Sequence, residues 1–230
     1  MHKFMLAAAM AAATAPQIAH AEDAAASGPA ISASLTGSTN YEWRGVTQSD
    51  NHAAVFAAVN LGYNGFYAGA GTENVEFAGV DQECALWGGY ALPLSRGLTL
   101  DVGFVRYGYV DAPANIDTLE VKGALTGSAG KLSVTGAAYH TRNYFGTHQS
   151  ATFLTATAKY AATDKISLSG SFGHQNVKSR FNYNTWNLGA SYALSSTASV
   201  DVRYHDTDDD GALFGRHGKG RLVGSFTVGF

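Results

Sequence analysis

Charged side chains that could act on a solute occur at alternate positions of apolar–polar runs. A period of two places such residues on one face of a strand, together with the Ser, Thr and Gly around them. If the runs are strands of one closed sheet, the charges face a common interior, where they either select solutes or pair as structural filling of the wall. The sequence leaves both readings open. The candidates are Glu83, Asp101, Glu120 and Lys122 on one wall, with Lys159, Asp201, Arg203, His205 and Arg221 on the other.

A metal-ligating pattern occurs once, in Asp206-Thr207-Asp208-Asp209-Asp210-Gly211. Alternate carboxylates followed by Gly form the first half of a calcium loop, with Asp206, Asp208 and Asp210 as candidate ligands. The twelfth position is His217 rather than the bidentate Glu that such loops require. A solvated acidic loop is the favoured reading, and calcium binding or bridging of lipid phosphates by a divalent ion is the alternative.

Catalytic chemistry has weaker support. His140, His148 and Asp111 could serve a hydrolase, but a nucleophile and its base must lie within hydrogen-bond reach, which spacing alone does not show. The sequence contains no nucleophile elbow, no H-E-x-x-H and no phosphate-binding glycine loop. We therefore expect a protein that is not an enzyme and that needs no cofactor.

The elements that position these residues are short alternating segments. We count twelve, most of them about 10 to 12 residues long, which is close to the length of a tilted strand that crosses a bilayer. Alternative counts of ten or fourteen remain open. The segments are Ile31 to Glu42, Ala53 to Tyr63, Phe66 to Phe77, Gln82 to Leu92, Leu98 to Val110, Asp117 to Thr126, Leu132 to Asn143, Ala151 to Ala161, Ile166 to Asn176, Asn184 to Leu194, Ala198 to Thr207 and Gly220 to Phe230.

The composition favours a membrane barrel over a soluble β-protein. A soluble sheet usually carries many Lys and Glu on its solvent face, whereas only 14% of this chain is charged and the polar faces are Ser, Thr, Gly and Asn. The formal net charge of −3 excludes the basic surface that nucleic-acid binding requires. Cys84 is the single cysteine, so no intramolecular disulfide can form.

The two ends of the chain indicate export and insertion. Residues 1–21 combine Lys3, a short apolar run and Ala19-His20-Ala21, the pattern of a cleaved signal peptide. Residues 22–30 then form a short periplasmic lead-in, and residues 31–230 form the barrel. The last segment ends on Phe230, as strands of outer-membrane barrels do. We expect this segment to pair with Ile31 to Glu42, because an open edge cannot exist in lipid.

The connections between segments predict the orientation. Tight turns are expected at Asn64-Gly65, Pro93 to Gly97, Gly127 to Lys131, Ala162 to Lys165 and Ser195 to Thr197. The other connections are longer, as external loops are, apart from Ala78 to Asp81. They are Arg44 to His52, Ala78 to Asp81, Asp111 to Ile116, Tyr144 to Ser150, Val177 to Tyr183 and Asp208 to Lys219.

One local motif resembles a known family. Tyr41-Glu42-Trp43-Arg44-Gly45-Val46-Thr47-Gln48-Ser49 is followed by Gly65-Phe66-Tyr67-Ala68-Gly69 and Asn74-Val75-Glu76-Phe77. This series is similar to the amino-terminal signature of the TorF family, a group of porin-like outer-membrane proteins of proteobacteria. The resemblance covers residues 41–77 and implies a porin-like barrel. It implies no substrate and no catalytic residues.

Together these observations predict an all-β protein, a transmembrane up-and-down antiparallel β-barrel of about twelve strands in the outer membrane of a Gram-negative bacterium. The expected function is passive diffusion of small hydrophilic solutes. An outer-membrane barrel hydrolase and a non-conducting structural barrel are the alternatives. Membrane lipid, lipopolysaccharide and the solutes are the expected partners, whereas the solute's identity, the oligomeric state and the openness of the lumen stay undetermined.

Two consequences follow from the strand register. One face of each strand should contact lipid, and a slip of one residue would reverse it. The predicted lipid-facing residues are Leu100, Val102, Val121, Leu168, Leu188, Val200 and Phe226. The acidic and basic walls should oppose each other across the lumen and create a transverse field, without a strong preference for simple ions.

Overall fold

The computed structural model describes residues 29–209 and 211–230, so the predicted signal peptide, most of the lead-in and Asp210 lie outside the described residues. The described chain is built almost wholly from strands. They are β1 (Ala30–Ser38), β2 (Glu42–Trp43), β3 (Val46–Thr47), β4 (Ala54–Tyr63), β5 (Phe66–Phe77), β6 (Val80–Ser95), β7 (Leu98–Tyr109), β8 (Thr118–Ala129), β9 (Leu132–Thr141), β10 (Ala151–Ala161), β11 (Ile166–Val177), β12 (Phe181–Ala193), β13 (Ala198–Thr207) and β14 (Arg221–Gly229), with a 3₁₀ turn η1 (Gly215–Gly218) before β14.

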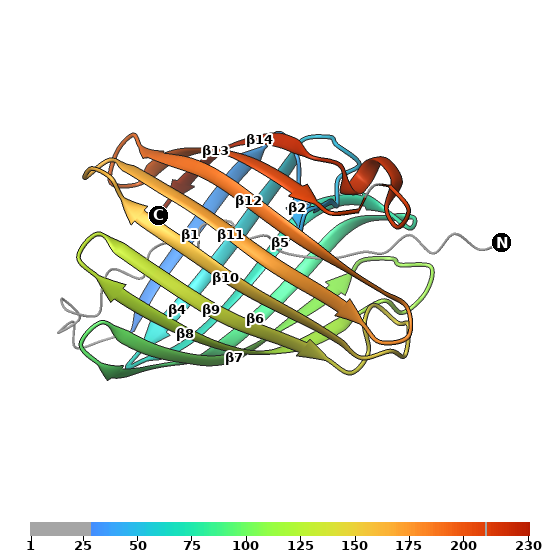
Figure 1. The fold of residues 1–230 in the computed structure, drawn as a ribbon, viewed down its shortest axis with the longest axis horizontal. Helices are drawn as coiled ribbons and strands as arrows, with labels where there is room; N and C mark the ends of the chain where they lie inside the picture. Colours follow the sequence, from blue (N-terminus) through green and yellow to red (C-terminus); the bar gives the residue numbers. More distant parts are fainter. Residues whose placement is uncertain (1–28, 210) are drawn as a thin grey trace.

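Twelve of the described strands form one closed antiparallel barrel, in which each strand pairs with its neighbours in sequence (Figure 1). β1 closes the sheet against β14, with Ser34 opposite Gly229 and Ser38 opposite Ser225. The predicted fold class and the predicted pairing of the two terminal segments are therefore confirmed. Closure leaves no unpaired sheet edge, which is the requirement for a strand protein in lipid.

The two ends of the barrel differ in their connections. At one end, here called the turn end, Asn64 and Gly65 both have positive φ, the conformation of the two-residue hairpin turn that their types predict. At the other end, here called the loop end, most connections are longer, and the longest joins β1 to β4. The predicted loop Val177 to Tyr183 is an exception, because β11 and β12 extend into it and leave only residues 178–180 between them. The link between β5 and β6 is only Ala78-Gly79, shorter than the predicted loop, with positive φ at both residues.

The first strand is shorter than predicted. We expected a strand from Ile31 to Glu42, but β1 ends at Ser38, and Glu42 belongs to the separate two-stranded sheet of β2 and β3. Asn40, Tyr41, Glu42 and Trp43 are all buried, so no outer face exists in this stretch. A local period therefore could not mark where the chain leaves the wall.

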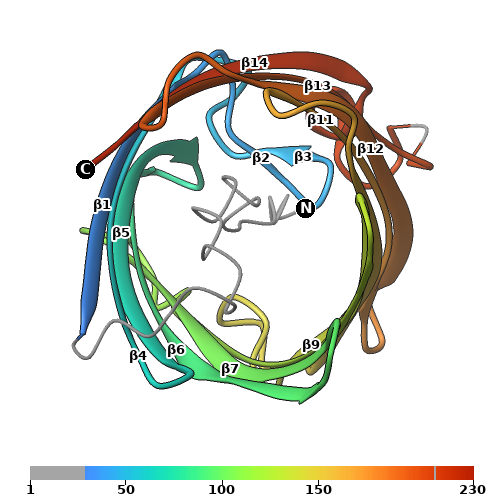
Figure 2. The ribbon, with the colours of Figure 1, turned by 90° about the vertical axis from the view of Figure 1, so that its left-hand side faces the viewer.

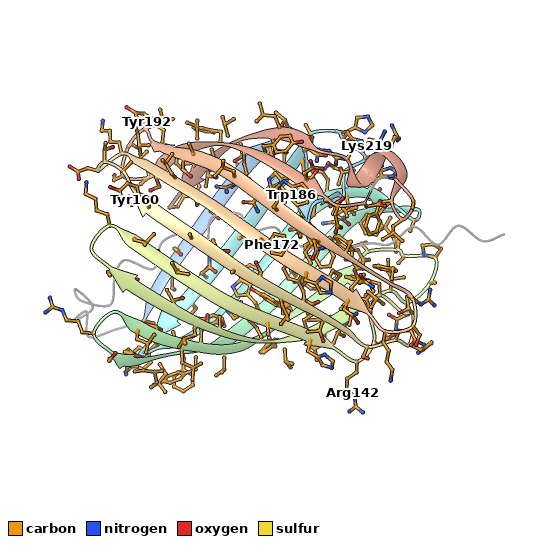
Figure 3. All side chains as sticks on the ribbon, in the orientation of Figure 1. Arg142, Tyr160, Phe172, Trp186, Tyr192 and Lys219 are labelled. Carbon is orange, nitrogen blue, oxygen red and sulfur yellow. The ribbon has the colours of Figure 1, made fainter. Side chains whose placement is uncertain are left out.

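The outer surface is apolar, as a lipid-facing surface must be. Of the predicted lipid-facing residues, Val102, Val121, Leu168, Leu188 and Phe226 are exposed on the outside of the barrel, and Leu100 and Val200 follow the same alternation with partial exposure. Figure 3 shows Tyr160 and Tyr192 toward the turn end, with Phe172 and Trp186 between the ends. No helix among the described residues is long and apolar enough to cross a bilayer.

The buried core lies inside the barrel at its loop end. Aromatic and aliphatic side chains from the wall, from the 39–53 connection and from the 142–150 loop pack together there. Residues with under a tenth of their surface exposed include Tyr41, Trp43, Val75, Phe77, Ala85, Tyr107, Tyr109, Tyr144, Phe145 and Val177. Wall positions nearer the turn end are only partly buried, so the interior is tightly packed at the loop end and more open at the turn end.

Candidate functional site

The connection between β1 and β4 folds into the barrel instead of extending away from it. Residues 39–53, which we call the inner hairpin, carry β2 and β3, and Figure 2 shows these two strands inside the ring formed by the others. Glu42 pairs with Thr47, and Trp43 with Val46. The inner hairpin is the feature that decides how much of the lumen is open at the loop end.

Arg44 at the tip of the inner hairpin is its strongest attachment to the wall. Its guanidinium lies 2.6 Å from a carboxylate oxygen of Glu120 on β8 and donates to Gln175 on β11 at 2.7 Å. The same group lies over the rings of Trp43 and Phe153, at 4.0 Å and 4.2 Å from their centroids. Burial lowers the pKa of Arg44, but Glu120 together with Tyr107 and Tyr144 outweighs burial, and the pKa is raised. A buried arginine so completely paired holds the tip in one position.

Glu42 attaches the hairpin to the closing strand. Its Oε1 accepts hydrogen bonds from Arg221 on β14 and from the Asn40 amide, each at 2.6 Å. Burial raises the pKa of the Glu42 carboxyl to about 7, against the lowering effect of Arg221 and Asn40. This carboxyl therefore titrates near neutral pH, on a segment that is not part of the spanning wall.

Further contacts add to the attachment. The Tyr41 hydroxyl donates to Glu83 on β6 at 3.1 Å, and the Gln48 carbonyl accepts from the Glu76 amide at 2.7 Å. On the loop side, Asp50 accepts from Arg216 and pairs with His217 at 2.8 Å. The hairpin thus contacts the wall at β5, β6, β8, β11 and β14, and it is anchored to the last external loop.

Gly45 brings the tip of the hairpin close to β12 and β13. It has a φ of 81°, and a Cβ at this position would collide with Oγ1 of Thr185 on β12 and Cγ2 of Thr207 on β13. Only glycine combines that backbone conformation with so close an approach. The inner hairpin therefore leaves the wall between β1 and β4 and packs its tip against β12 and β13, the third and second strands from β1 around the barrel.

Toward the turn end, the interior is lined by polar groups that the hairpin does not cover. Asp101 on β7 accepts from the Tyr67 hydroxyl and pairs with Lys122 on β8, each at 2.7 Å. On the other side, Asp201 and Arg203 on β13 pair at 3.0 Å. All four charged side chains remain partly exposed.

The predicted wall residues are thus divided between two roles. Glu83, Glu120 and Arg221 hold the inner hairpin, whereas Asp101, Lys122, Asp201 and Arg203 border the interior below it. Lys159 on β10 alternates with the outward Tyr160, so it faces the same interior, and it takes part in none of the ion pairs of the described chain. His205 also points inward, one strand position beyond Arg203.

The other candidates lie outside this interior. Asp206 accepts from the Tyr204 hydroxyl at 2.9 Å, and Asp208 accepts from the Asn184 side chain at 2.6 Å, so separate partners hold the two carboxylates. The described residues contain no group of three or more acidic, His or Cys side chains placed to hold a metal. His140 pairs with Thr152 at 3.0 Å, and Asp111 and His148 lie in loops with positive φ.

Sequence reasoning missed Tyr41, Glu42, Arg44, Gly45 and Gln175 as site residues. The first four belong to the motif that carries the resemblance to the TorF family, so that motif marks the inner hairpin. The motif was the one available signal, because a loop that is merely exposed does not require Arg-Gly between two apolar residues, Trp43 and Val46. Gln175 carries no comparable signal, because one Gln in an alternating strand is ordinary.

The sequence and the fold were compared with known proteins. Residues 22–228 match a family described as "Bacterial protein of unknown function (Gcw_chp)". No curated protein sequence matches the chain.

Several solved structures share the fold. The KdgM porin matches with a TM-score of 0.60 and 12% identity, over 86% of this chain and 96% of that one. A NanC porin structure matches with a TM-score of 0.62 and 12% identity, over 86% and 98%. A second KdgM structure, in complex with disordered oligogalacturonate, gives 0.60, 11%, 87% and 96%. At these identities the likeness shows a common architecture, a porin-type barrel, which agrees with an outer-membrane location.

Proposed function

This chain belongs to the Gcw_chp family of bacterial proteins of unknown function, and we propose that it is a porin-like channel of the Gram-negative outer membrane. Small hydrophilic solutes would diffuse through it passively. The inner hairpin would form its narrowest part, at the loop end.

The polar interior below the hairpin is the observation that carries this proposal. Its two walls hold the Asp101–Lys122 and Asp201–Arg203 pairs, which stay partly exposed inside a barrel whose outside is apolar. An interior built only to fill space would be packed throughout, as the loop end is. Charged groups kept accessible within a twelve-stranded barrel instead support a water-filled passage.

Three further assignments belong to this proposal: the family, the surrounding lipid and the residues that line the pore. Membership of the TorF family is supported by the motif at residues 41–77, whose parts lie in the inner hairpin, in the turn before β5 and in β5. Membrane lipid and lipopolysaccharide would surround the apolar outer surface. The residues proposed to line the pore are Asp101, Lys122, Lys159, Asp201 and Arg203, with Glu83, Glu120 and Arg221 acting through the hairpin.

A non-conducting barrel is the second candidate, because the loop end is packed and charge pairs bridge the hairpin to its surroundings. Against a hydrolase stands the placement of His140, whose ring pairs with Thr152 on the outer face. The two barrel hypotheses differ in one measurable property, the passage of ions.

Single-channel recording in planar bilayers tests the proposal. The refolded parent should give small, discrete current steps. The Arg44→Ala variant should give larger steps or a larger open fraction, because the tip of the hairpin loses Glu120 and Gln175. A folded barrel that passes no current either as the parent or as Arg44→Ala would favour the non-conducting barrel.

A further inference from the structure

Two buried glutamates beside the inner hairpin differ from every other buried carboxylate of the described interior. Glu73 on β5 and Glu83 on β6 are direct cross-strand partners, and they are 3% and 0% exposed. Glu42 and Glu120, equally buried, are each paired with an arginine. None of the ion pairs of the described residues includes Glu73 or Glu83.

A third polar group continues the same row. Tyr109 on β7 is the cross-strand partner of Glu83 and is 9% exposed. Both carboxylate oxygens of Glu73, Oε2 of Glu83 and the Tyr109 hydroxyl have no hydrogen-bond partner. Directly opposite residues have Cβ atoms about 5 Å apart, so the ends of these side chains can reach one point. The four buried oxygens therefore belong to neighbouring side chains in one row of the wall, within reach of a common point.

The inner hairpin covers this place from the lumen. The Tyr41 hydroxyl donates to Oε1 of Glu83, and its ring packs edge-on against Phe56, the cross-strand partner of Glu73, at 4.9 Å between centroids. Val75 and Phe77 close the row on the loop side. The surroundings are thus apolar apart from the oxygens themselves, which makes two uncompensated negative charges costly.

We propose that Glu73, Glu83 and Tyr109 bind a divalent cation, preferentially Ca²⁺, which ties the wall to the inner hairpin through Tyr41. One divalent ion neutralises two carboxylates, and it takes oxygen donors only. Ca²⁺ accepts bidentate carboxylates and an irregular shell of six to eight oxygens, so water can supply what the protein does not. Mg²⁺ requires near-ideal octahedral geometry and fits such a row less well.

A proton shared by the two carboxyl groups is the competing explanation. It would join one oxygen of each carboxyl group, and the Tyr109 hydroxyl, which lies beside Glu83, could donate to Glu83, but one oxygen of Glu73 would stay without a partner. A cation satisfies all four. The binding of a cation does not depend on whether the barrel conducts, so failure of this proposal and failure of the proposed channel are separate results.

Terbium luminescence tests the site directly, because Tyr109 and Tyr41 lie where they can sensitise a bound lanthanide. The mature protein is refolded into phosphatidylcholine vesicles free of lipopolysaccharide, which itself binds divalent ions. Tyrosine-excited Tb³⁺ emission should appear and should be displaced by CaCl₂ at lower concentration than by MgCl₂. Ca²⁺ should also raise the unfolding temperature relative to EDTA.

Isosteric variants assign the signal. Glu73→Gln and Glu83→Gln should each weaken Ca²⁺ displacement by about tenfold or more, because each removes one of two charged ligands. Glu76→Gln is the matched control: it lies on the same strand, points outward and is exposed, so it should behave as the parent.

Two results would overturn the proposal. One is a parent that gives no Ca²⁺-displaceable emission and the same unfolding temperature in Ca²⁺ and in EDTA, as a shared proton predicts. The other is emission that Glu73→Gln, Glu83→Gln and Glu76→Gln leave equally strong, which would place the ion elsewhere. If one glutamine variant fails to fold, the other variant and the parent titration still decide.

Discussion

The guanidinium of Arg44 and the carboxylate of Glu120 lie 2.6 Å apart in the interior of the barrel, with only 6% and 1% of their side chains exposed. The two residues are far apart in the sequence and belong to different structures, the inner hairpin and strand β8. Their contact joins a connecting segment to the wall across the lumen. It is therefore the interaction on which closure of the loop end most depends.

Removing one partner of this pair should be costly. Glu120→Gln leaves the Arg44 charge buried and uncompensated, so we expect a loss of about 3 to 5 kcal/mol in the free energy of unfolding. Urea unfolding in vesicles measures it. Asp117→Asn is the control, since it breaks the more exposed Arg106–Asp117 pair and should cost less than about 1 kcal/mol. Equal losses in the two variants would contradict the assigned role of Glu120.

The conductance should depend on pH through Glu42. Its pKa is about 7 while it is buried against Arg221, compared with an ordinary 4.5 when it is exposed. The inserted hairpin therefore binds the proton more tightly than a released one, so this contribution to insertion is full below about pH 4.5 and is lost as the pH rises through 7. We expect larger currents at about pH 8.5 than at about pH 5.5.

The control for that prediction is Glu42→Gln, which cannot titrate and should flatten the pH profile between these values. The pair of His217 and Asp50 at the base of the hairpin is left intact in this variant. A profile unchanged in Glu42→Gln would show that Glu42 does not cause the pH dependence.

The close approach at Gly45 predicts that alanine will not fit. Gly45→Ala adds a methyl group that meets Thr185 and Thr207 at a residue with positive φ, and we expect a cost of about 1 to 3 kcal/mol. The hairpin should become more accessible to protease. Gly136→Ala is the control, since no atom lies within 4 Å of its Cβ position. Equal protease resistance in both variants would place the tip away from β12 and β13.

The register of the wall can be tested at Val102, which is 48% exposed on the outer face. Val102→Arg should cost about 2 to 4 kcal/mol if this position is near the middle of the bilayer. Leu213→Arg, in the loop before η1, is the comparison, and we expect it to be tolerated. A Val102→Arg barrel that folds as readily as the parent would show that this face does not contact lipid.

Lys159 should control the ionic preference of the channel. The other interior charges near it are paired, so Lys159 leaves an excess of one positive charge. This changes the expectation of an acidic wall opposite a basic wall, because Glu83 and Glu120 contact the hairpin and do not border the open interior. Lys159→Gln should shift the reversal potential across a salt gradient toward cations. Arg142→Gln, a charge change at the loop end, should leave it unchanged (Figure 3); the same shift in both variants would refute the assignment.

The sequence alone determined the barrel. Alternation with a period of two, repeated over twelve segments, specifies which face of each strand is apolar, and Val102 and Leu188 accordingly lie outside while Asp101 and Arg203 lie inside. Turn residues such as Asn64 and Gly65 specify which ends are tight. These properties are local, because each depends on residues a few positions apart, and closure follows from the need to pair every backbone group in lipid.

Only the tertiary structure decided what the interior does. The inner hairpin depends on Tyr41 with Glu83, Arg44 with Glu120 and Glu42 with Arg221, pairs that are distant in sequence and that no local period encodes. In the sequence, Glu73 and Glu83 likewise resemble ordinary inward-facing charges. The register places them side by side, and no ion pair of the described residues joins either one to a basic side chain. Alternation along a strand shows which face a side chain lies on. Which residue it contacts across the lumen depends on how the whole sheet closes.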